Sequence, residues 1–470
     1  MMKKWMSLLL AGALSLGLCG CGSTEAPVGT ESTQPKKPVL KAGYGRESIA
    51  PDFPVGMRGY SDSETRKTGT LLDDIYTTCV AFNEGAQTIL VYTIDVCAMS
   101  ESWINKIREY VNAFTDIPCE NIFIGVTHTH SAPDMNEEAQ WDTMLLNCCL
   151  NAAQAAIADL APIQMQTATA TLENMNFVRH YLMNDGTYYG SNFGSLESGF
   201  KAHAIEYPDR QLILLKLDRE EKKDILMVNW QAHPAAAARQ NEYTGISADF
   251  IGHTRLKLEQ ETGMQVAYYT GALGNINPRS LITSENTNNN ESYIEYGKTL
   301  ADKIIATLPN LTPVEAEGIQ MTRLSYEVQI DHSWDHLIEE AKQVREVWKT
   351  ESQKAGDKLA AKHGMSSVYH ANAIINRYDM PGSELRELNA FRVGPIGFAA
   401  LTYQMFSDNA EYIKEHSPFD ITFILSSNWD YIGNKAAFEY RSYETDISNI
   451  ACGTGEILAE EYVKLLNAVK

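Results

Sequence analysis

Residues 39–470 alternate between apolar runs of strand length and amphipathic runs of helix length, and this alternation constrains the fold most. The clearest apolar runs are 88–94 and 121–126, and the clearest helical runs are 102–114 and 250–262. Continuous apolar strands separated by helices indicate sheets that are covered on both faces. The sequence therefore predicts a mixed α/β (α+β) fold, in which layered sheets are flanked by helices.

Other segments add to this prediction without fixing the order of the strands. Residues 212–217 and 224–230 are typical of a hairpin that turns at the charged stretch between them. The Lys- and Glu-rich residues 334–363 predict one long helix with a solvated face. Residues 455–469 predict a closing helix.

The N-terminus has the features of a targeting segment. Lys3 and Lys4 precede an apolar run, 5–18, which is shorter than the ~20 residues that a membrane span needs. Leu18-Cys19-Gly20-Cys21 resembles a bacterial lipobox, so residues 1–20 are predicted to be a lipoprotein signal peptide. Cys21 is then the lipidated first residue of the mature chain. Cys19 fits less well, because Leu18 precedes it where a small residue is expected.

Residues 21–38 are rich in Ser, Thr, Pro and Gly and are predicted to be a flexible tether to a single domain over 39–470. We therefore expect an exported protein that is lipid-anchored in the bacterial cell membrane and faces outside. The alternative is a plain secretory signal with two incidental cysteines.

The net charge and the spacing of the cysteines argue against some classes of binding partner and of metal site. A net charge of −21 argues against a nucleic-acid partner and against docking on anionic lipid, but not against a neutral lipid substrate. Two of the eight cysteines lie in the lipobox, and the others form no Cys-x-x-Cys pair. The sequence thus predicts neither a cysteine zinc site nor a disulfide framework.

Two histidines directly follow the buried strand predicted at 121–126. They are His128 and His130, in the segment 127–134. Residues two apart in extended chain point to the same side, and open α/β sheets bind ligands at strand ends. One histidine would then bind a metal ion while the other handles protons or substrate. The alternative is a pair of hydrogen-bonded histidines in a loop.

Further candidate residues also follow predicted strands. His233 ends the run 224–230, and a small-residue loop, 271–278, follows the strand predicted at 265–269 and allows close approach to a ligand. Tyr431 and Tyr443 lie in a C-terminal stretch, 401–444. Three histidines placed after buried strands fit a zinc centre with an open position for water.

In these motifs the chain resembles the catalytic domain of the neutral (alkaline, non-lysosomal) ceramidase family. The motifs that carry the resemblance are, in order, 41–45, 56–60, 127–131, 176–179, 232–234, 274–278, Tyr431 and 442–444. They span most of residues 39–470. The family's ceramidases often carry a further immunoglobulin-like C-terminal domain, and we expect no counterpart of it here.

The resemblance implies a bound Zn²⁺. His128 and His233 match the family's two zinc-binding histidines, and Tyr431 matches the tyrosine that completes the zinc site. Gln404 stands where the family has a zinc-binding glutamate. Its carbonyl oxygen can coordinate zinc, but without the charge that tightens binding.

The resemblance also implies the residues around the substrate. His130, Arg179 and Tyr443 match residues that surround the substrate amide, and Gly59 matches a glycine that lines the site. Asn277 replaces the family's serine beside the scissile bond. Asn277 cannot act as a serine-like nucleophile, although its amide can donate a hydrogen bond to an oxyanion.

The function that follows is zinc-dependent hydrolysis of a ceramide-like N-acyl amide by metal-activated water. His130 and Tyr443 would polarise the carbonyl or protonate the leaving amine, Asn277 would assist, and Arg179 would hold a polar part of a small-molecule or lipid substrate. The alternative is an inactive surface lipoprotein that binds a lipid, sugar or protein through the same cleft. Gln404 and Asn277 are the features that favour this alternative.

Overall fold

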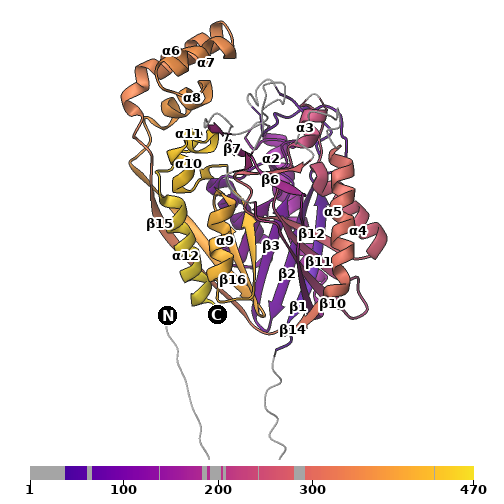
Figure 1. Ribbon diagram of the computed structural model, residues 1–470. Coiled ribbons are helices and arrows are strands. Elements are labelled where there is room, and N and C mark those ends of the chain that lie inside the picture. The colour runs from indigo at the N-terminus through magenta and orange to yellow at the C-terminus, as the bar shows by residue number, and fades with distance from the viewer. Residues whose placement is uncertain are drawn as a thin grey trace, which may run out of the picture. The chain divides into compact units, whose positions relative to one another are not determined.

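Two β-sheets form the centre of the structure, and helices cover their outer faces (Figure 1). The computed structural model describes residues 38–60, 66–136, 138–182, 188–190, 203–204, 208–241, 243–279, 292–427 and 429–470. The predicted signal peptide and the tether up to residue 37, with Cys21, lie outside the described residues. Residues from Val39 to Lys470 cluster as one unit.

The larger sheet has nine strands, in the order β12-β11-β10-β5-β1-β2-β3-β4, with β14 paired to β5. Its strands are β1 Lys41–Ser48, β2 Tyr76–Glu84, β3 Gln87–Ile94, β4 Ile122–Val126, β5 Ala161–Thr171, β10 Gln211–Arg219, β11 Ile225–Trp230, β12 Gln265–Thr270 and β14 Thr312–Val314. Most neighbours are antiparallel, including the predicted β10–β11 hairpin, but β3–β4 and β11–β12 are parallel.

The smaller sheet has the order β15-β16-β17-β19, and β17 and β19 are parallel. Its strands are β15 Ile319–Gln329, β16 Ser383–Val393, β17 Ile396–Leu401 and β19 Ile421–Ser426. An apolar core joins it to the larger sheet, and there Phe123 of β4 stacks on Phe391 of β16 with ring centroids 4.1 Å apart. The Asn229 side chain of β11 exchanges two hydrogen bonds with the backbone of Ile424 in β19.

These contacts bring the carboxyl ends of strands from both sheets together. The Thr270 hydroxyl, at the end of β12, donates to the Thr127 carbonyl after β4. The Ser426 hydroxyl, at the end of β19, donates to the Gly271 carbonyl after β12. The loops that follow β4, β11, β12, β17 and β19 therefore share one end of the molecule, as parallel strands require.

Three pairs of helices cover the sheets through their apolar faces. They are α1 Glu101–Thr115 with α2 Ala139–Ala158, α4 Asp249–Thr262 with α5 Tyr293–Thr307, and α9 Ser407–His416 with α12 Thr454–Ala468. The first pair packs on β2–β4, the second on β10–β12 and the third on the smaller sheet. In the part of the chain that the structure describes, no helix is long and apolar enough to cross a membrane.

The single helix predicted over 334–363 is wrong. The chain instead forms α6 Ile338–Thr350, α7 Gln353–Lys362 and α8 Val368–Arg377, which share a small core of their own. The break arises because Ser352 adopts an extended backbone and caps α7, its hydroxyl accepting from the Ala355 N–H at 3.2 Å. We call α6–α8 the helical arm. Figure 1 shows it next to α11 Tyr443–Ile447.

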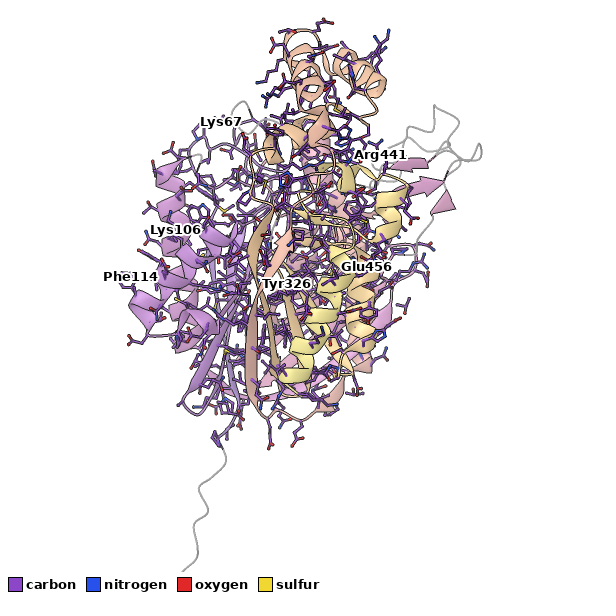
Figure 2. The ribbon with its side chains drawn as sticks, turned by 90° about the vertical axis from the view of Figure 1, so that its left-hand side faces the viewer. Lys67, Lys106, Phe114, Tyr326, Arg441 and Glu456 are labelled. Atoms are coloured by element: carbon purple, nitrogen blue, oxygen red, sulfur yellow. The ribbon has the colours of Figure 1, made fainter. Side chains whose placement is uncertain are left out.

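Arg441 joins the helical arm to the segment that leads into α11 (Figure 2). Its guanidinium lies 4.6 Å from the ring centroid of Trp334 and donates to the Gly364 carbonyl at 2.9 Å. Arg441 has a left-handed backbone, with φ of 59°. The next residue, Ser442, caps α11, because its hydroxyl accepts from the Thr445 N–H at 3.2 Å.

Candidate metal centre and active site

Three histidines from two separate strand ends lie around one buried point. The ring centroids are 5.0 Å apart for His128 and His130, 4.9 Å for His128 and His233, and 5.6 Å for His130 and His233. The three residues are buried, with exposed fractions of 1%, 7% and 0% in the same order. The structure therefore brings together all three histidines singled out in the sequence.

The sequence predicted that His128 and His130 face one site because they alternate along an extended chain, and this reason is wrong. His128 is not extended but left-handed, with φ of 67°. The His128 N–H donates to the Val96 carbonyl at 3.0 Å, and the His130 N–H donates to the Pro234 carbonyl at 2.9 Å. A tight turn held from two other strand ends, rather than strand alternation, thus aims both rings at one place.

The ring nitrogens of these histidines are buried and largely without partners. Among the described residues, no group hydrogen-bonds Nε2 of His128, Nε2 of His233 or either ring nitrogen of His130. Nδ1 of His233 lies 3.0 Å from the Ile276 carbonyl, so this nitrogen carries the proton and Nε2 keeps its lone pair. Burial and the charge of Arg179 lower the pKa of His128 to about 3 and also lower that of His233. Neutral imidazoles with free lone pairs are the form that binds metals.

Gln404 and Tyr431 are register partners in a short parallel pair, β18 Gln404–Met405 and β20 Tyr431–Ile432. Nε2 of Gln404 donates to the Trp429 carbonyl at 2.5 Å. Oε1 of Gln404 is buried and has no partner among the described residues. The Trp429 ring lies 6.0 Å from that of His128. The one oxygen of Gln404 that can coordinate a metal ion is therefore left available.

Arg179, just after β6 Asn176–Val178, connects the other predicted residues. Its Nη2 donates to the Tyr431 hydroxyl at 3.1 Å, and its Nη1 donates to Oδ1 of Asn277 at 3.4 Å. Its Nη2 also donates to the Gly274 carbonyl, and its Nε donates to Glu444 at 2.5 Å. Arg179 is thus engaged within the protein, and its predicted contact with substrate stays a prediction.

Asn277 lies in β13 Ile276–Pro278, which pairs with β6. Its side-chain oxygen accepts from Arg179, which orients the amide. Nδ2 of Asn277 is buried and has no partner within the described part of the chain. This leaves both N–H bonds of the Asn277 amide unpaired, at the position where the family resemblance implies a group beside the scissile bond.

Gly59 and Tyr443 complete the predicted set. Gly59 has φ of 114°, and a Cβ on it would lie 2.6 Å from Cβ of His130, so only glycine fits there. Tyr443 begins α11, and its ring centroid lies 6.0 Å from that of Tyr369 in the helical arm. Burial, with Tyr431 close by, raises the pKa of Tyr443, which keeps its hydroxyl protonated.

Glu444 and His180 were not predicted as site residues. Oε2 of Glu444 lies 2.8 Å from Nε2 of His180, and Nδ1 of His180 lies 3.0 Å from the Tyr440 hydroxyl. Burial raises the pKa of Glu444, but Arg179 and His180 outweigh it and lower that pKa to about 2. Glu444 is the last residue of the motif 442–444 and His180 directly follows the motif 176–179, and these positions are the signal that could have found them.

Cys97 is the other residue that the sequence did not predict here. One ligand atom each from Cys97, His128 and His130 lie within 4.8 Å of one another, and Cys97 is 1% exposed. The expectation of no cysteine near a metal site rested on the lack of Cys-x-x-Cys pairs. Cys97 follows β3 as His128 follows β4, and this position after a buried strand could have indicated it.

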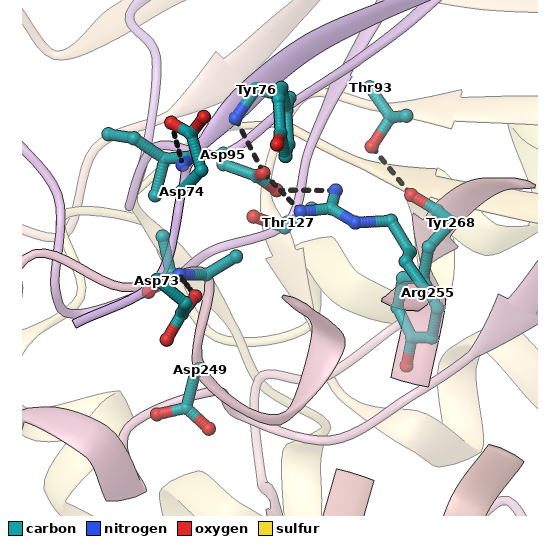
Figure 3. A network of polar contacts seen from close by, with 12 residues as sticks. Asp73, Asp74, Tyr76, Thr93, Asp95, Thr127, Asp249, Arg255 and Tyr268 are labelled. Atoms are coloured by element: carbon teal, nitrogen blue, oxygen red, sulfur yellow. Dashed lines mark hydrogen bonds and ion pairs between the residues drawn. The ribbon is translucent and has the colours of Figure 1, made fainter. Parts of the chain in front are cut away.

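Asp95, two residues before Cys97 in the chain, forms a buried ion pair with Arg255 (Figure 3). Both oxygens of Asp95 accept from Arg255 of α4, at 3.0 and 2.5 Å, and the Tyr76 N–H donates to Oδ2 of Asp95 at 2.8 Å. The Thr93 hydroxyl donates to the Tyr268 carbonyl of β12. The end of β3 is thus fixed to α4 and β12, so Cys97 lies on a rigid support.

The buried nitrogen and oxygen atoms that lack hydrogen-bond partners at this site form a donor set that fits a zinc ion. Nε2 of His128, Nε2 of His233 and Oε1 of Gln404 are buried acceptors without partners among the described residues, and such groups are costly unless something binds them. The Tyr431 hydroxyl adds a fourth ligand and the second oxygen. Two imidazoles with oxygen ligands form a normal zinc donor set.

The structure is thus a mixed α/β fold with a histidine-rich site at the carboxyl ends of strands from two sheets. It is similar to the crystal structure of neutral ceramidase from Pseudomonas aeruginosa, with a TM-score of 0.68 and 14% identity over 92% of this chain and 74% of that chain. It is equally similar to a structure of a ceramidase complexed with C2, with a TM-score of 0.67 and 14% identity over 92% and 75% of the two chains.

The likeness to these two structures shows that the chain has the fold of neutral ceramidase and confirms the predicted fold class. No protein-family model matches the sequence, and no curated protein matches it.

Proposed function

We propose that this protein is a zinc-dependent hydrolase that cleaves the amide bond of a ceramide-like N-acyl amide. The observation that carries the proposal is the group of buried ring nitrogens of His128, His130 and His233, which have no partner among the described residues. Leaving such nitrogens unpaired costs free energy that a bound ion would offset. The fold shared with two ceramidase structures supports the choice of amide over ester.

His128, His233, Gln404 and Tyr431 would hold the zinc ion. A zinc ion in such a site lowers the pKa of a bound water and polarises a carbonyl oxygen. Nδ1 of His233 is held by the Ile276 carbonyl, which fixes the ring. Arg179 holds the Tyr431 hydroxyl at 3.1 Å and so positions that oxygen.

The remaining residues would act on the substrate. Nδ2 of Asn277 donates to the oxygen that becomes negative as the amide carbonyl is attacked. Burial and the charges of Arg66 and Arg179 lower the pKa of His130, so His130 enters the reaction neutral and can accept a proton. Tyr443, protonated, would give its proton to the leaving amine, and Gly59 leaves room beside His130.

A second candidate function is binding without turnover. Gln404 is neutral where a carboxylate is expected, and Asn277 stands in place of a serine. With these changes the chain would act as a surface lipoprotein that binds a lipid, sugar or protein ligand at the same site. For either function, we propose that the protein is exported and anchored to the membrane through Cys21.

Metal content and hydrolysis, measured together, test the proposal. Protein purified without chelators should contain about one zinc per chain and cleave a fluorogenic N-acyl amide. His233→Ala should lose both, whereas His416→Ala, on an exposed histidine of α9, should keep both. Zinc without turnover on amides or esters would favour the binding protein. No zinc after reconstitution would rule out the hydrolase as proposed.

A further inference from the structure

The region around the three histidines has an excess of positive charge. Arg179 donates to the Tyr431 hydroxyl at 3.1 Å, and Arg66 donates to the His130 carbonyl at 2.6 Å. The guanidinium of Arg58 lies 4.7 Å from the ring centroid of Trp429, which lies beside His128. Of the carboxylates near it, Asp134 pairs with Arg58 at 3.0 Å and Glu444 pairs with Arg179 at 2.5 Å. Neither carboxylate is therefore available to balance a divalent cation.

The oxygen and nitrogen ligands proposed above do not supply this balance. His128, His233 and Gln404 are neutral, and the Tyr431 hydroxyl accepts a hydrogen bond from Arg179. Holding a doubly charged ion in a buried site with only neutral ligands is costly. An anionic ligand would lower this cost.

Cys97 is placed to be that ligand. Its ligand atom and those of His128 and His130 lie within 4.8 Å of one another. Cys97 is 1% exposed and lies three residues after the end of β3 and two after Asp95, which Arg255 holds. His128 and His130 also present buried ring nitrogens that have no partner within the described residues. Thiolate sulfur and imidazole nitrogen are both normal zinc ligands, so Cys97 would join His128 on the ion, with His130 beside them.

We propose that Cys97 is a ligand of the metal ion and that its thiolate supplies the negative charge that Gln404 lacks. This inference rests on the proposed metal centre. On binding, the Cys97 thiol releases its proton to the buffer, and Sγ donates an electron pair to the metal without any change of oxidation state. The ion is thereby held by one soft and several harder ligands, which favours Zn²⁺, Co²⁺ and Cd²⁺ over Mg²⁺ and Mn²⁺.

Loading the metal-free protein with Co²⁺ tests directly for a metal–sulfur bond. Reduced protein, stripped with a chelator and titrated with Co²⁺, should develop a near-ultraviolet thiolate-to-cobalt charge-transfer band. Cys97→Ser should lack that band but still bind Co²⁺ weakly, with visible bands alone. Cys149→Ser is the matched control, because Cys149 is also fully buried but contacts Thr77 in a different part of the fold. It should keep the band.

Metal affinity gives a second, independent measure. Cys97→Ser should weaken Zn²⁺ and Cd²⁺ binding on the order of 100-fold, since removing even a group that only supports a ligand costs 10- to 100-fold. Gln404→Glu should restore most of that affinity in the Cys97→Ser protein and add less in the wild type. Such coupling is expected if the two residues supply the same charge.

The outcomes separate this inference from the proposed function. One zinc per chain with no charge-transfer band, or with the band intact in Cys97→Ser, would overturn the role of Cys97 and leave the zinc site standing. Equal gains from Gln404→Glu in both backgrounds would overturn the charge compensation. Failure to bind any metal would overturn both proposals.

Discussion

Oε1 of Glu444 lies 2.5 Å from Nε of Arg179, and the two side chains are 0% and 6% exposed. The other oxygen of Glu444 contacts His180, and the other nitrogens of Arg179 reach Tyr431 and Asn277. A single buried carboxylate therefore sets the position of residues proposed to bind both metal and substrate.

Glu444→Gln should lower the free energy of unfolding by about 3–5 kcal/mol at pH 7, because Arg179 is left buried without its counter-charge. Glu339→Gln, which breaks an exposed pair with Lys342, should change it by about 0–1 kcal/mol. Urea unfolding of the purified variants measures both. A loss as small in Glu444→Gln as in the control would contradict the importance of the buried pair.

The same carboxylate should make stability depend on pH. Its folded pKa, about 2, is below the ordinary value of 4.5, so its contribution is fully present above pH 4.5 and is lost as the pH falls toward 2. Wild type should therefore lose stability faster than Glu444→Gln between those values. If melting experiments show that the two proteins lose the same stability as the pH falls from 4.5 to 2, the pKa of Glu444 is not depressed.

Gln404→Glu should tighten zinc binding in the wild-type background, because a carboxylate oxygen is a normal zinc ligand and its charge offsets that of the ion. Competition with a chromophoric chelator measures the change. Unchanged affinity would mean that residue 404 does not contact the ion.

Asn277→Ala should reduce amide hydrolysis by about 10²–10³-fold, as expected for loss of an oxyanion donor. Zinc content should not change, since Asn277 is not a proposed ligand. Asn277→Ser, which keeps a donor, should retain activity and shift it toward ceramide-like amides. If Asn277→Ala is as active as wild type, its free N–H does not stabilise the transition state.

Gly59→Ala should impair catalysis as well as stability. Glycines 59 and 263 both have positive φ, so alanine at either costs about 1–2 kcal/mol in backbone strain. Only at Gly59 does the new Cβ meet His130, whereas at Gly263 nothing lies within 4 Å. Turnover should thus fall in Gly59→Ala and be normal in Gly263→Ala, and equal turnover in the two would contradict a role for Gly59 in the site.

Cys21→Ala should move the protein from the membrane fraction to the soluble fraction, because the lipobox resemblance makes Cys21 the lipidated residue. Immunoblots of fractionated cells measure this, with Cys452→Ala as the control. Retention of Cys21→Ala on the membrane would contradict the anchor.

Much of the fold could be predicted because its signals are local. The runs 88–94 and 250–262 closely match β3 and α4, since apolar periodicity follows directly from which face is buried. The break at Ser352 could not be predicted in the same way. It depends on one capping hydroxyl inside a segment whose charges suit a continuous helix.

The residues of the site also divide into those with a local sequence signal and those without one. His128, His130 and His233 could be identified because each follows an apolar strand. Glu444 could not be assigned a partner, because His180 and Arg179 lie 264 and 265 positions away in the chain. Only the folded arrangement of two sheets brings such residues into contact.

The meeting of strand ends from two sheets has a mechanical consequence. An ion held by His128 and His233 on one side and by Gln404 and Tyr431 on the other would tie the larger sheet to the β17–β19 edge of the smaller sheet, much as a crosslink closes a long loop. Removing the ion would free both edges at once. Amide hydrogen exchange should then quicken together in residues 127–130 and 402–406, although these segments are far apart in the chain.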